Sequence, residues 1–113
     1  AVDMWEGKLY HDTDLKDRRI LGEEGFISVI TVVNRSTGTI VSGPEIHARG
    51  FAEDDAVFNE IKPKISKALE EAVTSNRDHT AYQLQQVVRR VVGTWVNRRL
   101  RRRPMIVPVV LEA

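Results

Sequence analysis

The chain has no cysteine among its 113 residues. This absence excludes disulfide bonds and thiolate metal ligands, and it agrees with a reducing compartment, so we expect a cytoplasmic protein. Long apolar runs are missing as well, because the longest ones, at residues 26–34 and 104–111, are far shorter than the roughly 18 residues of a membrane span. No basic segment followed by an apolar one is visible at the start, so we expect neither a secretory signal nor a membrane partner.

The motifs that usually carry catalysis or metal binding are also missing. His11, His47 and His79 lie far apart, and neither a His-x-His pair nor a His-Glu-x-x-His helix brings metal ligands together. Neighbouring carboxylates such as Asp54 and Asp55 do not converge on one bond as a general acid and base would. The glycines do not form a phosphate-cradling loop. The sequence therefore predicts no catalytic residue, no metal site and no cofactor in this chain.

What the chain does have is an uneven distribution of charge. Residues 77–113 hold eight arginines against two acidic residues, a net charge of +6, whereas residues 1–76 hold nine basic and fourteen acidic residues, a net charge of −5. The densest cluster consists of Arg98, Arg99, Arg101, Arg102 and Arg103. Such a cluster attracts polyanions such as RNA or an acidic partner. Arginines at the end of a helix also complement its negative C-terminal end without any ligand, so both roles fit the sequence.

Apolar, β-branched runs predict three strands. Residues 26–33 form the first, and after a turn at residues 34–38 the second returns from residue 39 as a hairpin that extends loosely to about residue 49. Pro44 lacks a backbone donor and therefore favours an edge strand or a bulge. The last strand is expected at about residues 104–111.

Two amphipathic helices are predicted between the second and third strands. From residue 55 to about 73, apolar residues recur at three- and four-residue steps on one face. Pro63 lies inside this pattern and should kink the helix or mark a late start. Thr80 with Gln83 forms a capping-box pattern that opens a second helix, which runs to about Leu100. Its apolar stripe contains Leu84, Val87, Val88, Val91, Trp95 and Val96.

The order β-β-α-α-β predicts a two-layer α+β fold, a three-stranded mixed sheet with both helices on one face. We assign residues 1–22 to a linker or N-terminal arm and residues 23–113 to the domain. Both alternating side-chain sets of the first strand are apolar, so one of them meets no helix. Leaving such side chains in water forgoes about 1.5–3 kcal/mol each, and we expect another copy of the domain, or the rest of a larger protein, to cover them. The residues expected at this oligomer interface are Ile27, Val29, Val107 and Val109, with the oppositely directed side chains as the alternative.

Three segments, at residues 16–25, 41–51 and 101–112, together resemble the C-terminal domain of bacterial ribonuclease J. The resemblance implies a parent enzyme of the metallo-β-lactamase superfamily with a β-CASP insertion, a zinc-dependent nuclease that cleaves RNA from the 5′ end and also internally. Its catalytic motif, His-x-His-x-Asp-His, is absent from this chain. The resemblance also implies that the domain follows a linker and supports self-association and activity.

We therefore expect a non-catalytic domain that contributes oligomerisation, for example as a homodimer, and RNA binding through the five clustered arginines. Two alternatives stay open: a stand-alone RNA-binding module, and a purely structural assembly domain of some other complex. Zinc is expected in the parent enzyme only.

Overall fold

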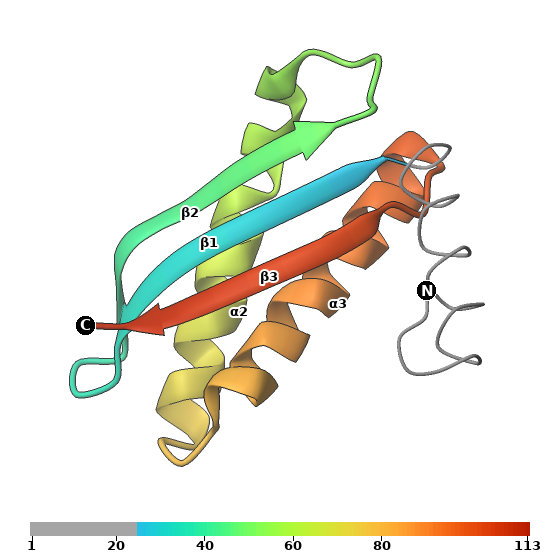
Figure 1. Ribbon diagram of the computed structural model, residues 1–113. Helices are drawn as coiled ribbons and strands as arrows, with labels where there is room; N and C mark the ends of the chain where they lie inside the picture. The colour runs from blue at the N-terminus through green and yellow to red at the C-terminus, as the bar shows by residue number, and fades with distance from the viewer. Residues whose placement is uncertain (1–24) are drawn as a thin grey trace, which may run out of the picture.

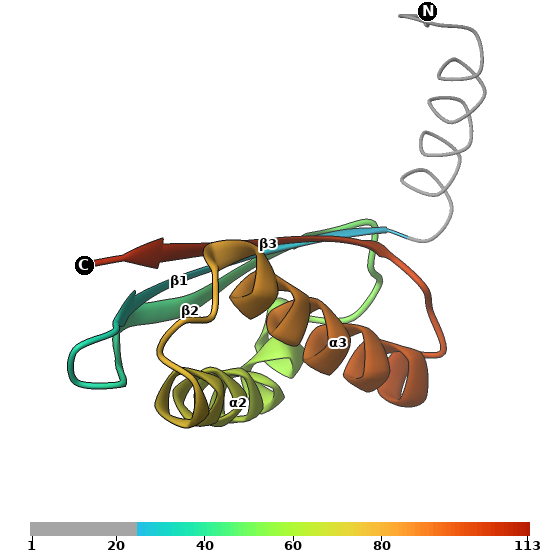
Figure 2. The same cartoon turned by 90° about the horizontal axis from the view of Figure 1, so that it is seen from below.

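Residues 25–113 are described by a computed structural model, in which a sheet and a pair of helices form two layers (Figure 1). In chain order the elements are β1 (Phe26–Asn34), β2 (Thr39–Arg49), the 3-10 helix η1 (Asp55–Glu60), α2 (Lys62–Ser75), α3 (Ala81–Leu100) and β3 (Met105–Glu112). β1 is the central strand, antiparallel to β2 and parallel to β3. Both helices lie on the same side of the sheet (Figure 2). The predicted α+β fold is thus confirmed, while the proposed arm at residues 1–22 lies outside the described residues.

The hairpin between β1 and β2 forms where the sequence predicts it. The Asn34 side-chain Oδ1 accepts hydrogen bonds from two backbone N–H groups of the turn, at 2.9 and 3.2 Å, a local bonding pattern that favours asparagine in turns. Gly38 closes the turn at a φ of +72°, which costs glycine little. Pro44 lies on the edge strand β2, beside register shifts that involve Ile30 and Val32. The proline therefore occupies an edge and an irregular position at once.

The two helices begin at the residues that the sequence marks. Pro63 lies in the first turn of α2, where a missing N–H costs no helical hydrogen bond, so it marks a late start and does not kink the helix. At the start of α3, Thr80 Oγ1 accepts from the N–H of Gln83 at 3.1 Å, and Gln83 Oε1 accepts from the N–H of Thr80 at 2.8 Å. The capping box is therefore confirmed. α3 ends at Leu100, and its C-cap residue Arg101 has a φ of +57°.

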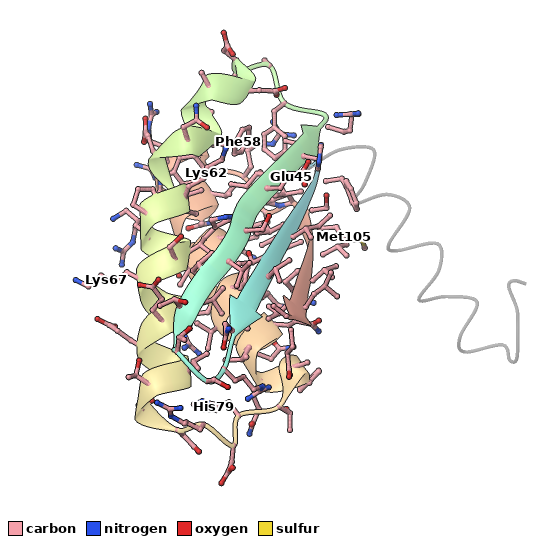
Figure 3. All side chains as sticks on the ribbon, turned by 90° about the vertical axis from the view of Figure 1, so that its left-hand side faces the viewer. Glu45, Phe58, Lys62, Lys67, His79 and Met105 are labelled. Carbon is pink, nitrogen blue, oxygen red and sulfur yellow. The ribbon has the colours of Figure 1, made fainter. Side chains whose placement is uncertain are left out.

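The hydrophobic core fills the space between the sheet and the helices. The buried stripe of α3 advances by four residues at a time through Leu84, Val88, Val92 and Val96. The predicted stripe omitted Val92, and Trp95 lies beside it, partly buried against the core. Figure 3 shows Phe58 between the helices and the sheet, where its ring contacts that of Trp95 at 5.7 Å between centroids. The short helix η1 thus closes one end of the core.

Candidate interaction surfaces

The face of the sheet that points away from the helices is open. Along β1 the side chains alternate strictly between buried and partly exposed, and no other element among residues 25–113 lies over the exposed side (Figure 2). Figure 3 shows Met105 on this side, opposite Phe58. We call this surface the open face. On β1 and β3 it consists of Phe26, Ser28, Ile30, Val32, Met105, Val107, Val109 and Leu111.

Strand β2 adds a charged margin to the open face. Glu45, His47 and Arg49 pair directly with open-face residues of β1, and directly paired residues project to the same side of a sheet. His47 Nε2 lies 3.0 Å from Glu45 Oε2, which agrees with that placement. The open face is therefore apolar over β1 and β3 and charged along β2.

The four residues expected at an oligomer interface do not share one face. Ile27 and Val29 are fully buried against the helices, whereas Val107 is 37% exposed and Val109 is partly exposed on the open face. The cause is the parallel register, which pairs Ile27 with Ile106 and therefore sets Val107 on the other side. The alternative set of β1 side chains is the one that accompanies Val107 and Val109.

The outer edge of β3 is closed by side chains of α3. Arg89 Nη1 donates to the carbonyl of Ile106 at 3.0 Å, and Gln85 Oε1 accepts from the N–H of Val110 at 3.3 Å. Pro108 lies between Ile106 and Val110 on β3. Its backbone nitrogen faces the same edge but carries no hydrogen to donate. A partner strand needs free backbone groups along an edge in order to extend a sheet. Association is therefore easier through the open face than through this edge.

The arginine cluster at the end of α3 divides into groups with different surroundings. Arg99 reaches Glu60 in η1, with Nε and Nη2 at 3.3 and 3.4 Å from the two carboxylate oxygens. Arg102 turns toward the loop after β2, where Nη2 donates to the carbonyl of Gly50 at 3.0 Å and the guanidinium lies 4.8 Å from the centroid of the Phe51 ring. Both contacts hold the end of α3 against neighbouring segments, so these two arginines have a structural role.

The remaining arginines of the cluster, Arg98, Arg101 and Arg103, are exposed at the surface. Arg98 contributes to a groove of about 610 Å³ between α2 and α3, and together with Arg103 it lines a second hollow of about 450 Å³. Arg101 is exposed beyond the helix end, where its backbone N–H donates to the carbonyl of Asn97 at 3.1 Å. The five arginines therefore have different surroundings, since two contact neighbouring segments and Arg98 and Arg103 line the same hollow.

Neither a metal centre nor a membrane-spanning helix is found among residues 25–113. Among the residues that the structure describes, no group of three or more His, Asp or Glu side chains is placed to hold a metal ion. Within the same residues, no helix is both long and apolar enough to cross a bilayer. Among the described residues, the open face and the groove between α2 and α3 are therefore the candidate functional surfaces.

Comparison with known proteins places the chain in one family. A family model described as the ribonuclease J C-terminal domain matches residues 13–113. The chain is 42% identical over 101 residues to a ribonuclease J of Mycobacterium tuberculosis and 40% identical over 102 residues to one of Mycolicibacterium smegmatis. It is 30% identical over 102 residues to ribonuclease J2 of Bacillus subtilis. These matches cover 89%, 89% and 87% of this chain but only 18% of each relative. The chain therefore belongs to the ribonuclease J C-terminal domain family.

Proposed function

We propose that this domain supplies self-association to a longer ribonuclease and contributes no catalytic residue itself. The relatives that support this proposal are named ribonuclease J, and the chain spans 18% of their length. The zinc-dependent cleavage of RNA that the family resemblance implies would rely on metal ligands outside this chain. The chain by itself should therefore leave labelled RNA intact in the presence of zinc, and cleavage by the purified chain would contradict this part of the proposal.

The open face is the observation that carries the proposal. Seven of its side chains on β1 and β3 are apolar, and two of them, Val107 and Leu111, are 37% and 51% exposed. Burying apolar surface contributes roughly 25 cal/mol per Å², so a partner that covers this strip stabilises the assembly. A second copy of the same strip is an apolar partner that is always present at matching concentration.

The charged margin on β2 is self-complementary. A two-fold axis that lies parallel to the sheet and perpendicular to its strands would set β1 and β3 over the same strands of a second copy, and β2 over an antiparallel β2. Glu45 would then face the partner's Arg49, and His47 would lie near the axis, because these residues alternate along the strand. Apolar surface would meet apolar surface, and each negative charge would meet a positive one.

Charge reversal on this margin tests the arrangement. Glu45→Arg and Arg49→Glu should each weaken self-association of the chain about tenfold, since each replaces two symmetry-related attractions, worth about 0.2–1 kcal/mol apiece, by repulsions. The double variant should restore association, because it rebuilds the pairs with exchanged signs. Sedimentation velocity over a range of protein concentrations measures the dissociation constant. Two reversals that add instead of compensating would rule out this geometry.

Val107→Asp tests the apolar part of the interface. It should give a folded monomer, because Val107 lies on the open face and not in the core. Lys67→Glu is the control for an added negative charge, since Lys67 projects from α2 on the far side of the molecule (Figure 3) and should leave association unchanged. An oligomer of unchanged affinity in Val107→Asp would refute self-association through this face.

RNA contact is a second candidate function, and it concerns the arginine cluster. Within residues 25–113, no hydrogen bond or ion pair occupies the side chain of Arg98 or Arg101, so both are available to phosphates. Substituting Arg98, Arg99, Arg101, Arg102 and Arg103 with glutamine should weaken RNA binding and flatten its dependence on salt. Unchanged affinity and slope would reject the RNA role.

A further inference from the structure

A groove on the outer side of the helix layer is separate from the open face. It has a volume of about 610 Å³ and lies between the start of α2 and the second half of α3. Val91 and Trp95 provide its apolar part, on a side of α3 next to the buried stripe. Because the sheet lies on the other side of the helices (Figure 2), a ligand in this groove leaves the open face uncovered.

The groove is strongly basic. Four of the side chains that line it are cationic and none is acidic: Lys64, Arg90, Arg98 and Arg99. Arg99 is partly neutralised by Glu60, with its Nε 3.3 Å from the carboxylate. The other three are exposed, and no hydrogen bond or ion pair holds their side chains within the described part of the chain. The groove thus carries three positive charges that have no ion-pair partner among the described residues.

Two arginines outside the groove lining make contacts that stabilise the fold. Arg89, the residue before Arg90, donates to the carbonyl of Ile106. Arg77 donates to the carbonyls of Arg35 and Ser36 at 3.3 and 3.0 Å. Arg77 and Arg89 stabilise the fold through these contacts, whereas Lys64, Arg90 and Arg98 have no such partner among the described residues, so the fold itself does not account for them.

The apolar part of the groove suits a flat ring. Trp95 is held in place by Phe58, at 5.7 Å between centroids and 55° between planes, and it is partly exposed where it lines the groove. A fixed aromatic side chain beside guanidinium groups is the usual platform for an unpaired nucleobase, with phosphates on the cations. An acidic peptide would satisfy the cations but would not need the ring.

We propose that this groove binds a short stretch of single-stranded RNA, with phosphates at Lys64, Arg90 and Arg98 and one base against Trp95. The inference rests on the RNA role proposed above for Arg98 and extends it to residues outside the arginine cluster. The second hollow shares Thr94 and Arg98 with the groove and ends at Arg103, so it continues the path of the strand. The volume of the groove, about 610 Å³, lies within the usual range of ligand-binding sites.

Matched double variants test the proposal. The chain is titrated into a labelled oligouridine of about eight nucleotides, and anisotropy is followed between about 50 and about 200 mM salt. Lys64→Gln with Arg90→Gln should weaken binding at least tenfold at the lower salt concentration and reduce the salt slope by about 1.4, at about 0.7 per phosphate contact. Lys62→Gln with Lys67→Gln removes the same charge from α2 outside the groove lining and should have a much smaller effect. Circular dichroism confirms that both variants are folded.

Tryptophan fluorescence tests the base contact directly. In a Trp5→Phe background Trp95 is the single tryptophan, and oligouridine should quench its emission with the same dissociation constant as the anisotropy titration. An octaglutamate of matching length should compete poorly. Equal competition by octaglutamate, or binding without quenching, would overturn the assignment to RNA bases.

The two proposals about RNA fail in different ways. If oligouridine binds and the groove variant loses no more affinity than the control variant, the groove is rejected while the arginine cluster keeps its RNA role. If no salt-sensitive binding occurs at about 50 mM salt, both are rejected.

Discussion

The two faces of strand β1 carry similar residues and have opposite surroundings. Ile27, Val29 and Val33 are almost fully buried under the helices. Ile30 and Val32, on the other face, are only partly covered. Hydrophobicity alone therefore does not identify the core side of this strand. The position of the helices determines which side becomes the core. The apolar side chains on the other side of the sheet stay accessible to a partner.

Strand β2 also differs between the helix side and the open side of the sheet. On the helix side, β2 contributes Ile40, Ile46 and Ala48, all packed against the core. On the open side it contributes Glu45 and His47 instead. Alternating charges along a strand edge can fix the orientation of two partners in an interface. Burial within a single chain does not require such a pattern.

Two isoleucines of β1, one on each face, should differ most in their contribution to stability. Ile27→Ala should lower the free energy of unfolding by about 2–5 kcal/mol, because it opens a cavity in a fully buried site. Ile30→Ala, on the open face, should cost the monomer less than about 1 kcal/mol, since less surface leaves a packed environment. Urea unfolding at low protein concentration measures both values. Equal losses would mean that the open face is covered within the single chain.

A glycine in the β2 irregularity should show the next largest effect. Gly43 has a φ of +87°, and a Cβ there would lie 2.6 Å from the carbonyl oxygen of Ile30. Gly43→Ala should therefore destabilise the fold by about 2 kcal/mol or more, from backbone strain and the contact together. It would also disturb the register that sets Glu45 on the open face.

Gly38→Ala is the control for the backbone term alone. Gly38 has a similar φ of +72°, but a Cβ there would meet only Thr74 Oγ1, at 3.8 Å. The expected cost is about 1 kcal/mol. Thermal unfolding of the two variants separates strain from steric contact, and a Gly43 variant no worse than the Gly38 variant would show that β2 shifts without penalty.

The parts of the fold that were predictable from the sequence depend on local chemistry. The hairpin turn at Asn34, the late helix start at Pro63 and the capping box at Thr80 each need only a few neighbouring residues, and the structure confirms all three. Element order then followed, because strands and helices of this kind have few ways to pack in two layers.

The candidate surfaces were less predictable because they depend on distant pairings. The sequence does not reveal that Ile27 pairs with Ile106, and without that register Val107 could not be assigned to a face. The groove is similar, since Lys64 and Arg98 meet only when α2 packs on α3. Arg102 could not be assigned to Phe51 either, because the contact joins segments about fifty residues apart in the chain. The one local signal for the groove is that residues 90, 94 and 98 recur at four-residue steps and therefore lie on one face of α3.

Thr31 places a hydroxyl group in the core, on the side of β1 that the helices cover. Thr31 is fully buried, and its Oγ1 has no hydrogen-bond partner among the described residues. Thr31→Val should raise the free energy of unfolding by about 1 kcal/mol, because an unsatisfied buried hydroxyl is replaced by a methyl group of similar size. Thr39→Val is the control, since the Thr39 hydroxyl is exposed and lies 2.7 Å from that of Thr37. A destabilised Thr31→Val would indicate a bound water or another partner for the hydroxyl.

The smallest effect concerns the contact between α3 and the covered face. Gly93 lies inside α3, and a Cβ there would meet Ile106 Cδ1 at 3.5 Å, an ordinary van der Waals distance. Gly93→Ala should therefore stabilise the protein by about 0.5–1 kcal/mol, because alanine favours the helix and the methyl group fits. Gly93→Val is the matched variant that adds a β-branch, and it should lose this gain. Chemical unfolding monitored by circular dichroism distinguishes them. If even alanine destabilises the fold, β3 packs on α3 more tightly than 3.5 Å allows, and glycine is then required to bring the covered face against the helix.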